Sequence, residues 1–228
     1  MNPKHLKIES ILLILMSGLL PISISAQDTP PNSYYVEVTG FYEDQFDGLY
    51  LQFDLGTELF RYKWIAPDLS INLLYGSVSD EDFDDRNRDG EIFFRSFDSQ
   101  SFMAWNAAFG AKFIIDDDPG QFIILPKYHF GKQEATGEYS DSDGIASKTR
   151  AFTSNSHWSL CAGYEFLHPK YYNKFGVYLR YTRFNAGKSL NLLNPENQVY
   201  HRTNFNTPAI GITLRFSTSF SKKVRASY

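Results

Sequence analysis

Hydrophobic and polar residues alternate with a period of two along most of the chain from residue 33 onward. Successive side chains of a β-strand point to opposite faces of a sheet, so this period predicts strands with one apolar and one polar face. The boundary between the first two strands is the least distinct. We predict eight strands, at residues 33–43, 48–61, 69–78, 101–114, 121–132, 157–166, 175–184 and 208–216.

The connections between the predicted strands differ in length. Pro67-Asp68 marks a turn, and so does the polar run from Asp116 to Gly120. Short and long joins alternate after the first hairpin, with short joins near 62–68, 115–120 and 167–174 and long polar segments at 79–100, 133–153 and 185–207. Outer-membrane barrels show this asymmetry, with short periplasmic turns and longer extracellular loops. The short join at 44–47 is an exception.

The two faces of the predicted strands differ in a way that orients the barrel. A soluble ligand-binding barrel has the same period with its apolar face inward. Here the apolar face carries Trp105, Trp158 and several tyrosines, which is too much bulk for the inside of eight strands. The polar face carries charges of both signs, which can pair inside a barrel. The predicted lumen network is Asp54, Glu58, Lys112, Lys127, His129, His157, Glu165, Arg180 and Arg215.

The N-terminus has the order of a secretory signal peptide. Lys4 and Lys7 precede an apolar run, and small residues ending at Ala26 follow it. The alternative is a transmembrane anchor, but the run is shorter than the ~20 residues that a spanning helix needs, and Pro21 interrupts it. We therefore expect export, with residues 1–26 as the signal and 27–228 as the mature chain.

The composition of the mature chain narrows its class. Its net charge is −5 (20 Lys and Arg against 25 Asp and Glu), which offers no basic surface for nucleic acid. Aromatic residues make up 17% of the chain, as expected for a barrel with interfacial aromatic girdles. Cys161 is the single cysteine, so an intrachain disulfide is excluded. It points to the polar face and is interpreted as a small filler.

The last predicted strand, Gly211-Ile212-Thr213-Leu214-Arg215-Phe216, resembles the closing strand of the small outer-membrane β-barrel family (porin-like or OmpA/OmpX-like proteins). The resemblance implies an all-β, antiparallel, up-and-down transmembrane barrel in the cell outer membrane. It also implies contact with outer-membrane lipid and an assembly signal, Gly211, Leu214 and Phe216, read by the barrel-assembly machinery. The sequence departs from the family pattern by continuing for twelve residues after Phe216, a segment we expect to be a periplasmic tail (217–228).

One string in the first long segment resembles half of a Ca²⁺ loop. Asp85, Asn87 and Asp89 place oxygen atoms at alternate positions, and Gly90 occupies the sixth position, as in an EF-hand. The twelfth position, which should supply a bidentate carboxylate, is Ser96. These three residues are the candidate metal ligands; the favoured alternative is a solvated acidic loop with an Asp-Gly turn.

A second string resembles part of an enzyme motif. His157 and Ser159 have the His-x-Ser spacing of the outer-membrane lipid A deacylases, but Leu160 replaces the asparagine of that motif. The period directs both side chains to the lumen, away from lipid, so we interpret them as part of a hydrogen-bond network. A metal site of His129, His157 and Glu165 requires an alignment of strands that the sequence does not fix.

The leading functional hypothesis is a structural or surface-interaction protein whose lumen is closed by charge pairs. Eight strands enclose a space that their own side chains fill, which argues against a diffusion porin. The alternatives are a lipid A-modifying hydrolase and a narrow pore or small-solute carrier. We predict no catalytic residue and, apart from the candidate Ca²⁺, no cofactor.

Overall fold

The computed structural model describes residues 32–43, 48–78, 81–86, 92–141, 146–168, 173–193 and 208–219. The predicted signal peptide lies outside these ranges. Within them, no helix is long and apolar enough to cross a membrane. The elements are β1 (Ser33–Glu43), β2 (Gly48–Glu58), β3 (Ile65–Val78), β4 (Glu81–Arg86), β5 (Ile92–Asp117), β6 (Gly120–Asp141), β7 (Ala146–Leu167), β8 (Lys174–Thr182), the short helix α2 (Gly187–Leu190) and β9 (Ala209–Thr218).

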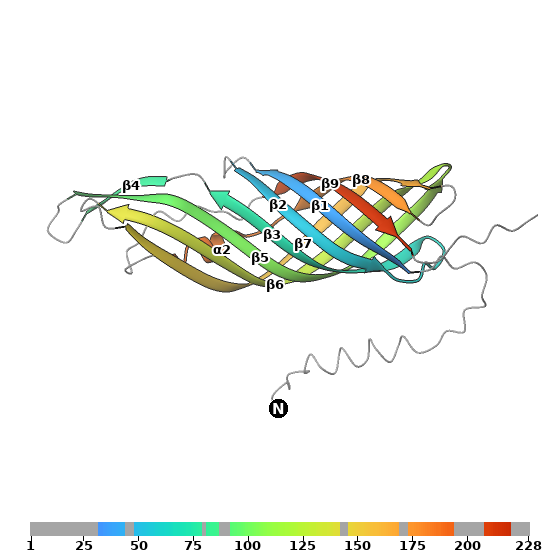
Figure 1. The fold of residues 1–228 in the computed structure, drawn as a ribbon, viewed down its shortest axis with the longest axis horizontal. Helices are drawn as coiled ribbons and strands as arrows, with labels where there is room; N and C mark the ends of the chain where they lie inside the picture. The colour runs from blue at the N-terminus through green and yellow to red at the C-terminus, as the bar shows by residue number, and fades with distance from the viewer. Residues whose placement is uncertain are drawn as a thin grey trace, which may run out of the picture.

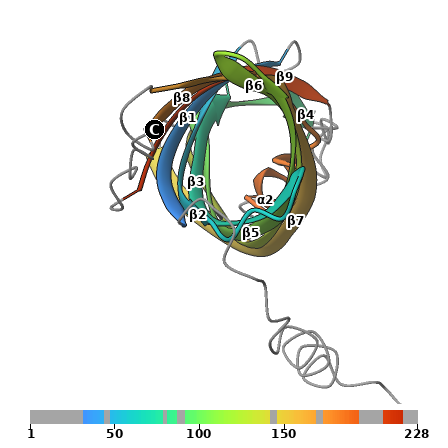
Figure 2. The same cartoon turned by 90° about the vertical axis from the view of Figure 1, so that its right-hand side faces the viewer.

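Eight of the strands close into a barrel. The strand order is β3-β2-β1-β9-β8-β7-β6-β5, and β3 pairs with β5 to complete the ring. Every pairing is antiparallel, and the end-on view in Figure 2 shows the closed wall. The remaining strand, β4, pairs with the first part of β5 and lies outside the ring. The predicted eight-stranded antiparallel up-and-down barrel is therefore confirmed.

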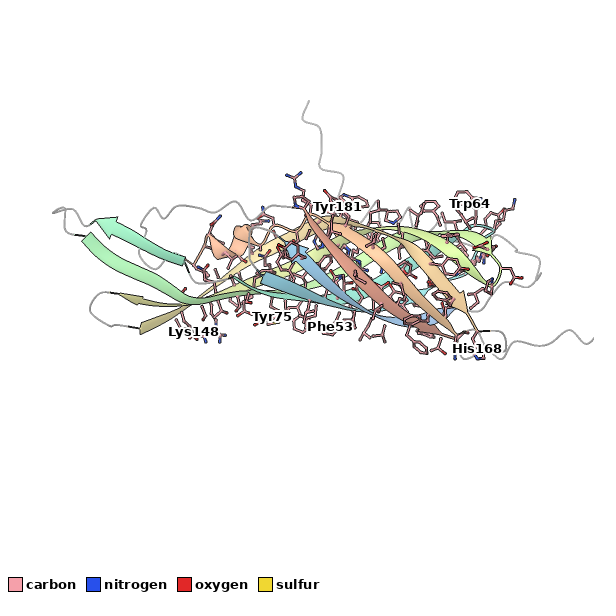
Figure 3. The ribbon with its side chains drawn as sticks, turned by 90° about the horizontal axis from the view of Figure 1, so that it is seen from above. Phe53, Trp64, Tyr75, Lys148, His168 and Tyr181 are labelled. Carbon is pink, nitrogen blue, oxygen red and sulfur yellow. The ribbon has the colours of Figure 1, made fainter. Side chains whose placement is uncertain are left out.

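The alternation of residue types separates an apolar outside from a polar inside. Ile71 and Leu179 are 64% and 63% exposed, whereas the side chains of Lys112 and Arg180 are fully buried. Figure 3 shows Phe53, Tyr75, Trp64 and Tyr181 on the outer wall. Exposed apolar residues around a charged interior reverse the arrangement of a soluble protein, and they match a barrel that faces lipid.

Three strands continue far beyond the others at one end of the barrel. β5, β6 and β7 contain 26, 22 and 22 residues, compared with 11 in β1 and 9 in β8. Figure 1 shows them as long hairpins beyond the rim. The prediction of loops at 79–100 and 133–153 is therefore largely wrong. Residues 133–141 of β6 are mostly polar, so period-two hydrophobicity does not mark this part of the strand.

The predicted turn at Pro67-Asp68 is also wrong. The chain reverses at Tyr62–Ile65, where Tyr62 and Ile65 exchange backbone hydrogen bonds of 2.8 and 3.0 Å. Pro67 is the third residue of β3, and its carbonyl accepts from Leu59, just after the end of β2. Pro67 has no backbone N–H to donate the reciprocal bond to the Leu59 carbonyl, and this loss is tolerated because Leu59 lies beyond the last residue of β2. The predicted turn before Gly120 is correct, since β5 ends at Asp117 and β6 begins at Gly120.

The Tyr62–Ile65 turn holds a residue in an unfavourable backbone region. Lys63 has φ 52°, a conformation that costs an L-residue roughly 1 kcal/mol and costs glycine little. We expect Lys63→Gly to raise the free energy of unfolding by about that amount, measured by urea titration of the refolded protein. Lys63→Ala is the control, because it removes the side chain and keeps the penalty. Equal midpoints for the two variants would contradict the strain.

Candidate functional site: the closed lumen

The interior of the barrel is built in three layers between its two ends. The turn end carries the short turns at 62–65 and 117–120, and the hairpin end carries the extensions of β5, β6 and β7. Starting from the turn end, the interior contains a layer of ion pairs packed against a small apolar cluster, a belt of amides and histidines, and an apolar plug. The small cluster consists of Ala66, Ile114, Ile123, Leu125, Cys161 and Tyr178. Because every second residue of a strand points inward, successive inward residues of one strand lie in successive layers.

Arg215 is the centre of the ion-pair layer. Its guanidinium nitrogens lie 2.8 Å from Glu37, 2.7 Å from Glu58 and 3.0 Å from Asp68. It also lies over the ring of Tyr35, 3.5 Å from the centroid. The planar fork of arginine suits several carboxylates at once, and β9 positions it between β8 and β1, the strands that pair with β9.

Lys127 and Arg180 lie on the side of this layer that faces the hairpin end. Lys127 lies 3.1 Å from Asp68 and 3.4 Å from Glu37. Arg180 lies 2.5 Å from Glu37 and 3.1 Å from Asp54. Glu37 thus joins three cations, counting Arg215. The Arg180 Nε also donates to the Cys161 sulfur at 3.0 Å, which gives the buried thiol a structural position.

Lys112 and Glu165 close the layer toward the turn end. Lys112 lies 2.5 Å from Glu58 and 2.6 Å from Glu165. Tyr178 and Gln121 donate hydrogen bonds to Glu165. Half-buried Lys174 lies 2.7 Å from Glu58. With Lys174 included, five cations face five carboxylates in the described part of the chain. Buried charges are tolerated when they are paired and hydrogen-bonded in this way.

The structure places all nine predicted network residues in the lumen, but it divides them between layers. The seven charged residues lie in the ion-pair layer, while His129 and His157 lie in the belt. Three members of the ion-pair layer, Glu37, Asp68 and Lys174, are not in the predicted network. Glu37 lies on the polar face of the predicted strand 33–43, whereas the sequence predicts a turn at Asp68 and a short join at 167–174 that ends with Lys174. The inward position of Asp68 follows from the alternation once β3 is started at Ile65.

The belt is a chain of hydrogen bonds across the lumen. Asn155 donates to Asn106, Asn106 donates to Asn72, and Asn72 contacts Nδ1 of His129, each at 2.9 Å. Nε2 of His129 lies 2.8 Å from the Ser159 hydroxyl. The rings of His129 and His157 stack with their centroids 4.4 Å apart.

The belt does not have the geometry of a serine hydrolase. The Oδ1 atom of Asn72 accepts from Asn106, so its amide N–H₂ faces His129 and donates to Nδ1. The ring proton then lies on Nε2, which donates to the Ser159 oxygen. A catalytic base needs a lone pair at that position to take the serine proton. His157, the partner that the sequence motif suggests, stacks on His129 instead.

The predicted metal sites fare differently. Among the described residues, no three His, Cys, Asp or Glu side chains gather as a metal site. Glu165 lies in the ion-pair layer, apart from the His129–His157 pair, so the suggested three-residue cluster does not form. Asn87 and Asp89 of the candidate Ca²⁺ loop lie outside the described residues. The backbone of Asp85 belongs to β4, and the Ca²⁺ site stays a prediction.

An apolar plug closes the hairpin end, and the sequence prediction missed it. Residues 183–193 follow β8 and turn inward, with α2 inside the ring in Figure 2. Gln133 holds this segment by donating to the Ala186 carbonyl at 2.9 Å. Phe184 stacks on Phe102 with centroids 5.4 Å apart. The buried cluster consists of Phe41, Tyr50, Leu74, Phe102, Ala104, Ala135, Ala151, Phe184, Ala186, Leu190, Leu193 and Ala209.

The predicted assembly residues lie on β9 in two orientations. Leu214 and Phe216 point outward, and Gly211 points inward. A Cβ at Gly211 would lie 2.6 Å from the carbonyl oxygen of Gly40, so this close approach of β1 requires glycine. β9 extends to Thr218, two residues into the predicted tail. The recognition of these residues by assembly machinery stays a prediction.

No known protein-family model matches the chain, and no curated protein matches it in sequence. The structure is similar to the crystal structure of Neisserial surface protein A, with a TM-score of 0.47 and 8% identity over 85% of this chain and 100% of that one. It is also similar to Ail, the attachment invasion locus protein of Yersinia pestis, with a TM-score of 0.35 and 12% identity over 82% and 96% of the two chains. The fold itself is established by the strand order and register: the chain is a closed, eight-stranded antiparallel β-barrel.

Proposed function

We propose that this chain is an integral outer-membrane protein whose barrel is a closed anchor for the hairpins that project from it. One observation carries this proposal: a continuous apolar outer wall encloses an interior filled by paired charges. A chain that exposes this much apolar surface needs lipid around it. Charged side chains at these outward positions would be costly in contact with lipid.

The filled lumen supports a structural or interaction role over transport. The ion-pair layer and the plug close the interior in succession, and, apart from half-buried Lys174, the side chains that build them have less than a tenth of their surface exposed. A path for solutes would require the displacement of several mutually paired charges. The β4–β5 and β6–β7 hairpins are therefore the parts that we propose to meet other molecules outside the cell.

The proposal predicts a protein that inserts into membranes and does not conduct. The refolded mature chain should migrate faster on a gel before heating than after heating, as folded barrels in detergent do. In a planar bilayer it should give no current steps, while a general diffusion porin in the same membrane serves as the positive control. Stepwise conductance would overturn the closed lumen, and solubility without detergent would overturn the membrane assignment.

A further inference from the structure

Two cations of the outer wall, Lys132 and Arg183, and the exposed Lys188 of α2 lie near the hairpin end without a carboxylate partner in the described part of the chain. Lys132 and Arg183 are exposed and form no ion pair there. Among the described residues, the Lys188 amine contacts the carbonyl and hydroxyl oxygens of Ser154, at 2.7 and 3.2 Å. Lys132 is the direct cross-strand neighbour of Ser154, so both amines lie beside this serine.

Other cations on this wall are already neutralised. Lys148 lies 2.5 Å from Glu138, and Arg150 lies 3.8 Å from Glu134. Among the described residues, this region of β6, β7 and the segment after β8 thus carries five cations and two carboxylates. They are Lys132, Lys148, Arg150, Arg183 and Lys188, and Glu134 and Glu138. This excess of positive charge stands out on a chain whose net charge is −4, and it is complementary to an anion.

Aromatic residues lie beside these cations, at the border of the apolar wall. Trp105 on β5 is the cross-strand neighbour of Lys132. Arg183 follows Thr182, whose hydroxyl donates to the Trp158 carbonyl at 3.3 Å. Trp105 and Trp158 are 59% and 62% exposed. Aromatic side chains occupy the lipid–water interface of membrane proteins, which places these cations at headgroup level.

Below this border the apolar wall is hollowed. Ala162 on β7 lies directly between Ile124 of β6 and Leu179 of β8. A methyl group between two large side chains leaves a depression, and a hollow of about 690 Å³ is lined there by apolar residues that also include Phe122, Val177 and Ile212. A cavity with this lining on a lipid-facing wall suits a hydrocarbon chain.

The spacing along β7 relates the hollow at Ala162 to the cations near Ser154. On β7, Ala162 lies four residues from Trp158 and eight from Ser154. These separations are roughly 13 and 26 Å along the strand, or about 10 and 20 Å along the membrane normal for a strand tilted by about 40°. One leaflet supplies about 15 Å of hydrocarbon, half of the ~30 Å core. We propose that this face binds one anionic lipid, with its phosphate headgroup at Lys132, Lys188 and Arg183 and an acyl chain in the hollow at Ala162.

This inference rests on the proposed membrane insertion and is tested on the refolded full mature chain by native mass spectrometry. Phosphatidylglycerol and phosphatidylcholine with the same acyl chains are the two probes. We expect one phosphatidylglycerol to be retained in preference. The triple variant Lys132→Gln, Lys188→Gln, Arg183→Gln should lose that preference by at least about tenfold, since each basic residue contributes on the order of 1 kcal/mol to binding of an anionic lipid.

Two controls separate the parts of the site. Lys148→Gln with Arg150→Gln removes paired cations and should leave the preference unchanged. Ala162→Leu fills the hollow and should lower the retention of both lipids, while Ala107→Leu, on the outer face of β5, should not. Inorganic phosphate should not displace the lipid, and displacement would reassign the site to free anions.

The failure of this inference is distinct from the failure of the proposed function. Equal retention of the two lipids, or an unchanged preference in the triple variant, would overturn the lipid site even if the heat-dependent gel shift and the silent bilayer are observed. Loss of the gel shift in the unmodified chain would instead overturn membrane insertion, on which the lipid site depends.

Discussion

Replacement of Arg215 by methionine is expected to lower the free energy of unfolding of the barrel by about 3 to 5 kcal/mol. The guanidinium contacts Glu37, Glu58 and Asp68. Its removal leaves three carboxylates buried with one cation fewer, and the cost of an uncompensated buried charge exceeds that of the lost contacts. The change is measured by urea titration of the refolded protein, with the unheated gel band as the signal of the folded state.

Arg150→Met is the matched control for this variant. Arg150 also pairs with a glutamate, but the pair is exposed and 3.8 Å apart, so its loss should cost about 0 to 1 kcal/mol. Similar urea midpoints for Arg215→Met and the unmodified chain would show that the ion-pair layer does not hold the barrel together. The urea midpoint of Arg215→Lys should lie between those of Arg215→Met and the unmodified chain, because lysine keeps the charge and loses the planar fork.

The barrel could be predicted from the sequence because its main determinant is local. Each outer residue, such as Ile212 or Leu214, lies between inward residues of a different chemical type, and this alternation fixes the strand and the face together. The inward direction of Lys112, Lys127 and Arg180 follows from the same pattern. Eight strands of this kind then leave one arrangement of faces that keeps the charges away from lipid.

The pairing inside the lumen could not be predicted, because it depends on register between strands far apart in the chain. Glu37 meets Arg180 and Arg215 only when β1, β8 and β9 are adjacent and correctly aligned. Asp68 was misplaced because proline is usually a turn residue, and the tolerance of Pro67 depends on where β2 ends. These are properties of the closed sheet and not of a sequence window.

The plug was missed for a different reason. Residues 185–207 are polar on average, and the apolar residues Leu190 and Leu193 are too few to change that average. The available signal was their three-residue spacing, one turn of helix, together with Phe184 just before the segment. The plug also reveals a division of roles, since the ion-pair layer and the apolar cluster close the lumen by independent interactions.

This independence leads to the second large effect, expected for Phe184→Ala. Phe184 is 1% exposed and stacks on Phe102, and the loss of a buried phenylalanine costs about 3 to 5 kcal/mol. Because the barrel wall closes without residues 183–193, the cost should fall on the docking of this segment. Hydrogen exchange of its backbone amides should accelerate by roughly 100-fold to several thousand-fold, while the urea midpoint of the barrel stays within error.

Leu192→Ala is the control, because Leu192 is 57% exposed and its loss should leave the exchange unchanged. The Phe184→Ala barrel should remain silent in a planar bilayer, since Arg215, Lys127 and their carboxylates still fill the lumen below the plug. Conductance in this variant would show that the plug alone seals the barrel. A fall in the urea midpoint as large as that of Arg215→Met would show that the plug and the ion-pair layer unfold as one unit. It would also contradict the proposal that the barrel is a stable anchor and the plug a separately docked cover.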